Sequence, residues 1–482
     1  MYTMTNKYIS LQFIIFLVLG LLFGLSVTVI GNLPGRLLVV VLLGFAFPFI
    51  AAIIGDVRRF LMAAIVISIP LRIDANFRRI FENQAGASSL GVSLIDIFLI
   101  VLMFLWFIQL ASDENVRMSF FPRLFVPALL YFEACLLTLL WLPRMDLATL
   151  ELVQMIKVLM LFFIVANQIR NRDDLRLVLW ALIATVAFES VLAIIQAASG
   201  KRLDLGFLGE AQNDKEAGKM YRVGGTLGHP NRLAMYLELL LPVTLGLFWS
   251  GKKRWHRLFA LTIFSLGLIA MLLTGSRGGW IGLLFGLVVF FYFVVKTKKL
   301  ELRAIVGPGL IALLILIAIS LAFSDVILHR FQGEDYGSAE SRIPMIQIAL
   351  NLIAANPVGG VGINNYQVVM HRYNNSIRAL QYISIDRPVH NMYLLITGET
   401  GLIGFTAFAI LVFMLLTALN RATKSRDLLL SITAASLFAG YAGFMVHGLV
   451  DKHSPGGYTL FYVMLAVSAA VYYTAKREDN SL

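Results

Sequence analysis

Long apolar stretches recur along almost the whole chain, and they limit what it can fold into more than any other feature. A membrane-spanning helix needs about 20 mostly apolar residues, and about fourteen segments have that character. Hydrophobic residues make up 59% of the 482 positions and charged residues 14%, well below the roughly 25% of charged residues in soluble domains. This composition excludes a soluble enzyme, a disordered chain and a disulfide scaffold.

The apolar segments predict an all-α polytopic membrane protein with about 12–14 transmembrane helices. The segment at 60–71 is short enough to be re-entrant instead of spanning. The fourteen candidate segments lie near residues 8–30, 35–54, 60–71, 93–111, 124–142, 150–168, 175–197, 231–249, 257–274, 280–296, 304–323, 391–418, 428–450 and 457–475.

Lysine and arginine in the short loops predict the orientation, because such residues accumulate on the cytoplasmic side. With fourteen helices, six basic segments fall on one side, which we expect to be cytoplasmic together with both termini. The loop at 72–92 is the exception, since its three arginines would lie outside. The net charge of +12 is therefore attributed to these loops and not to binding of nucleic acid. The six basic segments are Arg58–Arg59, Arg170–Arg172, 251–257, 296–303, 421–426 and Lys476–Arg477.

Two outer loops are expected to be long, at about 198–230 and 324–390. Within the second, the apolar spacing from Ser341 to Ala355 predicts a helix with one apolar face that lies along the membrane surface. Asn356-Pro357 should end this helix. The glycines of the turn 359–362 would then allow the backbone to pack closely or to approach a ligand.

Polar residues at the expected outer helix ends are candidates for a functional site, because ionisable groups in a membrane protein usually have a function. The first cluster holds Arg222, His229 and Asn231, and Asn231 is a plausible helix cap. Its alternative interpretation is a capped loop with an arginine that reaches to the membrane surface. The second is the turn Thr274–Gly279, where Arg277 and the start of a helix favour an anion. Its alternative is a surface arginine in a tight turn.

Two further clusters contain histidines. In the segment Arg387–Asn391, His390 could act as a general base near neutral pH, although a structural histidine bonded to backbone is the alternative. The cluster of His447, Asp451, Lys452 and His453 is interpreted as a polar interface. The sequence has no nucleotide-binding loop of the G-x-x-x-x-G-K-[ST] type and no metal-ligand spacing on the expected outer face, so neither an ATP-driven pump nor a metal-dependent enzyme is supported.

These motifs resemble a known superfamily. His390-Asn391, followed after nine residues by Gly401-Leu402-Ile403-Gly404, is similar to the H-[NSQ]-x9-G-x-x-G pattern of O-antigen ligases. Arg222 before Gly-His-Pro-Asn, the Ser276-Arg277-Gly278 turn and the segment 356–362 resemble the same superfamily, which also contains O-antigen polymerases and protein O-oligosaccharyltransferases. The likeness covers roughly residues 180–450, so we divide the chain into an N-terminal helical part at 1–170 and a ligase/polymerase-like core at 171–475.

The resemblance implies a GT-C-type, metal-independent, inverting glycosyltransferase without a cofactor. Such enzymes take a glycan from undecaprenyl pyrophosphate on the outer face of the bacterial inner membrane and give it to lipid A–core, or to another lipid-linked glycan in the case of a polymerase. Arg222 and Arg277 would hold the donor pyrophosphate and His390 would activate the acceptor hydroxyl. Secondary candidates for substrate contact are His229, Asn231, Arg342, Arg387 and Asn391.

Three functions remain open at this point. The histidine–glycine pattern favours the ligase. The R-x10-G spacing described for polymerases is absent when counted from five arginines of the outer loops, Arg202, Arg222, Arg330, Arg342 and Arg372. The extra helices and the loop at 72–92 favour the polymerase. A transporter or flippase is less well supported, because the polar clusters lie at outer helix ends and not at mid-membrane depth, and no internal repeat is visible.

Overall fold

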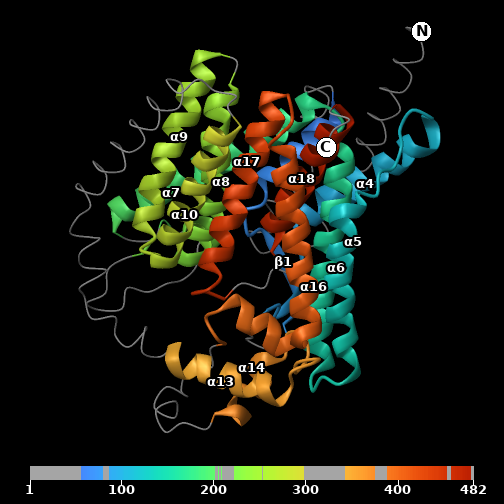
Figure 1. Cartoon of the computed structure of the whole chain (residues 1–482), viewed down its shortest axis with the longest axis vertical. Helices are drawn as coiled ribbons and strands as arrows, with labels where there is room; N and C mark the ends of the chain where they lie inside the picture. Colours follow the sequence, from blue (N-terminus) through green and yellow to red (C-terminus); the bar gives the residue numbers. More distant parts are fainter. Residues whose placement is uncertain are drawn as a thin grey trace, which may run out of the picture.

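A computed structural model describes residues 56–79, 86–200, 203, 205, 208, 222–251, 253–297, 342–374, 388–452 and 458–478. Over these residues the chain is predominantly helical (Figure 1). Ten of the described helices are long and apolar enough to cross a membrane, which confirms the prediction of an all-α polytopic membrane protein. The predicted segments at 8–30, 35–54 and 304–323 lie outside the described residues.

The ten helices follow the predicted segments closely, because length and hydropathy are local properties of the sequence. The first four are α4 (Leu94–Ser112), α5 (Pro122–Leu137, extended by the 3-10 turn Thr138–Leu140), α6 (Met145–Gln168) and α7 (Arg172–Ser199). The next three are α8 (Pro230–Ser250), α9 (Arg254–Leu273) and α10 (Arg277–Lys296). The last three are α16 (Met392–Ala422), α17 (Leu428–His447) and α18 (Thr459–Glu478).

Glycines bring α10 and α17 into close contact. A Cβ atom placed on Gly282 would lie 2.8 Å from the carbonyl oxygen of Gly443, and one on Gly286 would lie 2.7 Å from that of Ala439. Small residues spaced four apart allow two membrane helices to approach closely and gain packing contacts. This contact fixes the first residue of α10, Arg277, beside the last turn of α17.

The predicted segment at 60–71 is the short helix α3 (Val57–Ile67), and the predicted loop at 72–92 is largely an antiparallel hairpin. Its strands are β1 (Asp74–Arg79) and β2 (Ser89–Ser93), followed directly by α4. Lys157, halfway along α6, donates to the Gly91 carbonyl (2.8 Å) and pairs with Asp96 (2.5 Å). The hairpin is a short non-helical element of the predominantly helical fold, and contacts with α6 and α4 satisfy part of its polar backbone.

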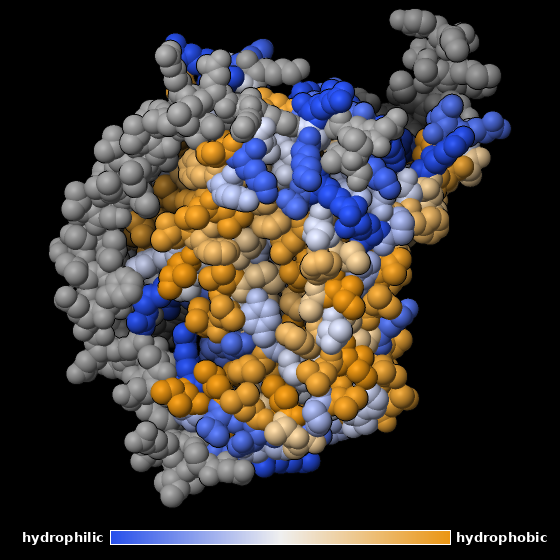
Figure 2. Space-filling view, viewed as in Figure 1, coloured by the Kyte–Doolittle hydropathy of each residue, from blue (hydrophilic) through white to orange (hydrophobic). Residues whose placement is uncertain are grey.

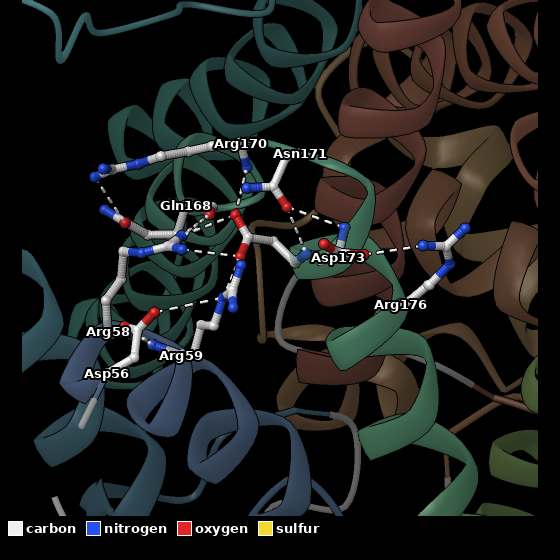
Figure 3. Close-up of polar contacts among 9 residues, drawn as sticks. Asp56, Arg58, Arg59, Gln168, Arg170, Asn171, Asp173 and Arg176 are labelled. Carbon is white, nitrogen blue, oxygen red and sulfur yellow. Dashed lines mark hydrogen bonds and ion pairs between the residues drawn. The ribbon is translucent and has the colours of Figure 1, made fainter. Parts of the chain in front are cut away.

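Ion pairs bind the arginines that are predicted to be cytoplasmic. These ion pairs lie at the end of the bundle that carries the last residues of α18. The buried carboxylate of Asp174 accepts from Arg58 (2.8 and 3.0 Å) and from Arg59 (2.9 Å), and the backbone N–H of Arg170 donates to it as well (Figure 3). Arg172 pairs with Asp427 (3.0 Å) and Glu478 (2.8 Å) at the ends of two other helices. Arg58–Arg59 and Arg170–Arg172 thus share one side with the C-terminal helix end.

At the opposite end, residues 342–374 form a small unit beneath the helices (Figure 1). Its helix α13 (Arg342–Ala355) confirms the helix predicted at 341–355, and it stops just before Asn356 as expected. The unit continues through α14 (Tyr366–Val369) and a 3-10 turn, Met370–Tyr373. Asn364 and Asn365 attach it to the start of α6 through hydrogen bonds to the carbonyls of Leu147 (2.8 Å) and Arg144 (3.1 Å).

Two glycine-containing segments, the turn 359–362 and the break at Gly401, pack against each other where this unit meets α16. Gly401 interrupts α16 with φ 64° and ψ −168°, a conformation that glycine tolerates and other residues do not. At this break the Val361 N–H donates to the Gly398 carbonyl (2.9 Å) and the Leu402 N–H donates to that of Pro357 (2.9 Å). The predicted close backbone packing of the turn 359–362 is confirmed, and its partner is α16.

Candidate functional site

A chain of hydrogen bonds links four side chains at the lower helix ends, and the four come from three predicted clusters far apart in the sequence. Arg222 donates to Asn231 Oδ1 (2.8 Å), and Asn231 Nδ2 donates to Asp451 Oδ2 (2.5 Å). The other carboxylate oxygen, Asp451 Oδ1, lies 3.1 Å from His390 Nδ1. Asp451 is buried and His390 is partly exposed. The structure therefore brings Arg222 and His390 to opposite sides of one carboxylate.

The turn that carries Arg277 adjoins this chain. Arg222 Nε donates to the Thr274 carbonyl (2.8 Å), so its side chain lies over the turn. Ser276 caps α10 by accepting from the Gly279 N–H (3.4 Å). A Cβ placed on Gly278 would lie 2.6 Å from His447 and 2.7 Å from Val450. Arg277, the first residue of α10, is thus held between Arg222 and the end of α17.

The start of α8 differs from the sequence prediction. Asn231 was expected to cap this helix, but the cap is His229, whose Nδ1 accepts the Asn231 N–H (3.2 Å). The reason is Pro230, which has no N–H to offer and fits the first helical position. With the cap provided by His229, the Asn231 amide bridges Arg222 and Asp451.

His229 is accessible to solvent, although protein surrounds much of its side chain. This burial lowers the pKa of His229 to about 4, Asp451 opposes the shift, and Arg222, Arg232 and Lys452 add to it. His229 is therefore neutral near pH 7, which is also the form that can accept the Asn231 N–H. Figure 2 shows hydrophilic residues gathered at the lower end of α17, between the apolar helix sides above and the 342–374 unit below.

A second histidine–carboxylate pair adjoins the first. His447 Nδ1 is 2.9 Å from Glu238 Oε2, both side chains are fully buried, and His447 Nε2 is 3.9 Å from Asp451 Oδ2. The sequence interpretation of His447 and Asp451 as a polar interface missed that Asp451 is the centre of the cluster. Glu238 was missed altogether, although a carboxylate in the middle of an apolar helix was a signal.

The remaining candidate residues have different surroundings. Asn391 caps α16 by accepting the Leu394 N–H (3.0 Å), and its Nδ2 donates to the Leu449 carbonyl (2.9 Å), which ties α16 to the end of α17. Arg342 begins α13 and lies near enough to act electrostatically on His447. Arg387 lies outside the described residues. Among the parts of the chain that the structure describes, no group of three or more His, Cys, Asp or Glu side chains could hold a metal ion.

Comparison with known proteins supports two of the sequence motifs, the turn that carries Arg277 and the segment that carries His390. The family model of O-antigen ligases matches residues 261–409, a range that includes Arg277 and His390. An uncharacterised protein of Haemophilus influenzae is 29% identical over 175 residues, which are 34% of this chain and 44% of that protein. The match thus spans under half the length of this relative. Residues 261–409, under a third of the chain, are therefore similar to the O-antigen ligase family, and this match supports the resemblance to the O-antigen ligase and polymerase superfamily.

Proposed function

We propose that this protein transfers a glycan from undecaprenyl pyrophosphate to an acceptor hydroxyl on the outer face of the bacterial inner membrane. The acceptor in this proposal is lipid A–core, as for an O-antigen ligase. The observation that carries the proposal is the convergence of Arg222, the Arg277 turn and His390 around the end of α17, three motifs from distant parts of the chain.

The arginines suit the leaving group. A pyrophosphate departs readily once its developing negative charge is balanced, and guanidinium groups balance it with directional, charge-assisted hydrogen bonds. Arg222 binds the Thr274 carbonyl and Arg277 directly follows Ser276, so both arginines adjoin the same turn and could contact one diphosphate group. No metal ion enters this proposal.

His390 suits the role of general base. Asp451 Oδ1 engages the Nδ1 side of the imidazole, which orients the ring and makes Nε2 the nitrogen that accepts a proton. In the proposed step the acceptor oxygen attacks the anomeric carbon while the bond from that carbon to the pyrophosphate oxygen breaks. The hydroxyl proton passes to His390, and the single in-line displacement inverts the anomeric configuration.

Purified protein in nanodiscs with a defined undecaprenyl-pyrophosphate-linked glycan tests the proposal. We expect transfer to lipid A–core that persists in excess EDTA and is lost in His390→Ala. A requirement for Mg²⁺ or Mn²⁺ would contradict the metal-free displacement. Failure of all transfer by the folded wild-type protein to any hydroxyl acceptor would contradict glycan transfer.

The alternative is an O-antigen or exopolysaccharide polymerase that joins lipid-linked repeat units. The same assay separates the two when the lipid A–core acceptor is replaced by a second lipid-linked repeat unit. A ladder of products spaced by one repeat would favour the polymerase, and a single product on lipid A–core would favour the ligase.

A further inference from the structure

Two arginines beside the candidate site, Arg72 and Arg232, are not among the residues proposed above to contact the donor. Arg72 follows the short helix α3, and Arg232 lies in the first turn of α8. Both side chains are exposed to solvent. Among the described residues, neither guanidinium donates a hydrogen bond or forms a salt bridge, whereas Arg222 is anchored to Asn231 and Thr274.

Packing of the short turn before α8 brings these two arginines to the same place. The Thr226 hydroxyl, on the turn Gly225–Leu227, donates to the Pro70 carbonyl (2.8 Å). A Cβ placed on Gly225 would lie 3.7 Å from Leu233, the neighbour of Arg232. Pro70 and Leu233 therefore flank one turn, and each is within two residues of an arginine. The two guanidiniums are close enough to repel each other.

The carboxylate that acts electrostatically on Arg232 already has other partners. Asp451 acts on Arg232 from a distance, but its Oδ1 accepts the Lys452 N–H (2.7 Å) and lies against His390, while its Oδ2 accepts from Asn231. Two like charges close together repel each other, and an anion that binds both removes this repulsion. Each guanidinium offers five N–H donors in a planar fork that matches phosphate or carboxylate oxygens.

The place of this pair relative to the donor contacts indicates which substrate it serves. Arg277 lies at the α9–α10 turn, on one side of the end of α17. Arg232 interacts electrostatically with Arg72, with Asp451 and with Tyr458, which lies just before α18. An in-line displacement needs the acceptor and the leaving pyrophosphate on opposite sides of the anomeric carbon.

We propose that Arg72 and Arg232 form an oxyanion subsite for the acceptor, one that binds a phosphate or carboxylate group of the acceptor glycolipid and sets its hydroxyl toward His390. This inference rests on the proposed glycan transfer. It adds a requirement on the acceptor chemistry: an acceptor with an acidic group near the reacting sugar should be preferred over its uncharged counterpart.

Steady-state transfer to one acceptor preparation, phosphorylated or treated with phosphatase, tests the subsite. In the wild type we expect the phosphorylated acceptor to have the lower KM. Arg232→Gln and Arg72→Gln should each raise that KM roughly tenfold, with a much smaller effect on the KM of the dephosphorylated acceptor and on the KM of the donor. The matched control is Arg254→Gln, an exposed arginine at the opposite end of the bundle, which should change none of these values. Equal effects on both acceptors, or an effect on the donor alone, would overturn the proposal.

A second measurement does not depend on transfer. Phenylglyoxal modifies accessible arginines, and mass spectrometry of the full-length protein in detergent follows each site. Inorganic phosphate, compared with chloride at equal ionic strength, should slow modification of Arg72 and Arg232 severalfold and leave that of Arg254 unchanged. Absence of this protection would overturn the subsite even if the enzyme transfers glycan. If phosphate protects both arginines but the protein transfers no glycan, the anion site is present and the proposed function is wrong.

Discussion

His390 Nδ1 lies 3.1 Å from Asp451 Oδ1, although 61 residues separate them in the chain. The contact is possible because α16 and α17 meet at this end, where the Met392 N–H donates to the Gly448 carbonyl (2.8 Å) and Asn391 reaches Leu449. A carboxylate in this position orients an imidazole and stabilises its protonated form. Asp451 would therefore act through His390 and not on the substrate itself.

We expect Asp451→Asn to lower kcat for transfer by about 10²-fold or more, because the amide no longer favours the orientation and charge that His390 needs. Protein yield and melting temperature should change little, since an asparagine can keep the hydrogen bond from Asn231. The pH–rate profile is the decisive readout, and its acid limb should shift in this variant. Asp113→Asn, at an exposed position at the other end of the bundle, is the control. An unchanged pH profile with a lowered melting temperature would reduce Asp451 to a structural role.

Arg277→Ala should nearly abolish transfer while leaving insertion and folding intact. The motivation is an arginine at the first position of α10, beside the Arg222 side chain and the end of α17. Loss of a charge-assisted hydrogen bond to phosphate costs about 1.5–3 kcal/mol, or more for a bidentate contact. Arg277→Lys should rescue poorly, because lysine lacks the planar fork. Wild-type activity in the alanine variant would remove Arg277 from the site.

His229 should not be the group that titrates in the acid limb of the pH–rate profile. Its pKa is lowered to about 4, below the ordinary imidazole value of about 6.5. Above pH 5 the folded protein therefore keeps it neutral, and His229→Gln should leave the acid limb in place. The same shift makes the unfolded chain bind one more proton between these two values, so it lowers stability as the pH falls from about 6.5 toward 4. The melting temperature of His229→Gln should depend less on pH over that range than that of the wild type.

The sequence predicted the helices because each one is encoded by its own stretch of apolar residues. The α13 helix was predictable for a similar reason, since its apolar spacing and the Asn356-Pro357 stop are local signals. The hairpin was not predictable, because its two short strands depend on Lys157 and Asp96, contacts that only the folded bundle creates.

The candidate site could be predicted in its parts but not in its arrangement. Arg222, Arg277 and His390 stood out because charged groups at apolar helix ends are unusual. Asp451 carried the same signal, but nothing local distinguishes a carboxylate at an interface from one that joins two motifs. The cap of α8 was assigned to Asn231 because asparagine is a common cap, whereas the folded chain uses Asn231 to bridge Arg222 and Asp451.

Cysteine labelling should place residues 342–374 outside the cytoplasm. The basis is the gathering of the basic segments at the opposite end of the bundle. In a Cys135→Ser background, which removes the one buried native thiol, the exposed position Ala355→Cys should react with an impermeant maleimide in spheroplasts. Lys253→Cys, exposed in the basic loop between α8 and α9, should react only after lysis. The reverse pattern would put the proposed chemistry on the wrong side of the membrane.

Two neighbouring aspartates at the start of α7 should differ sharply in their effect on stability. The Asp174 side chain is fully buried and neutralises Arg58 and Arg59, whereas Asp173 is 72% exposed and pairs only with Arg176 among the described residues. Asp174→Asn removes the charge that two guanidiniums share, and loss of one partner from a buried ion pair typically costs about 3–5 kcal/mol. Asp173→Asn removes an exposed pair that salt screens, so its effect should be small. Thermal melting of the two variants in the same detergent measures the difference. Because both residues lie at the end of the bundle away from Asp451, the transfer rate per folded molecule should match the wild type in each, and equal melting temperatures would show that Asp174 does not hold α3 to α7.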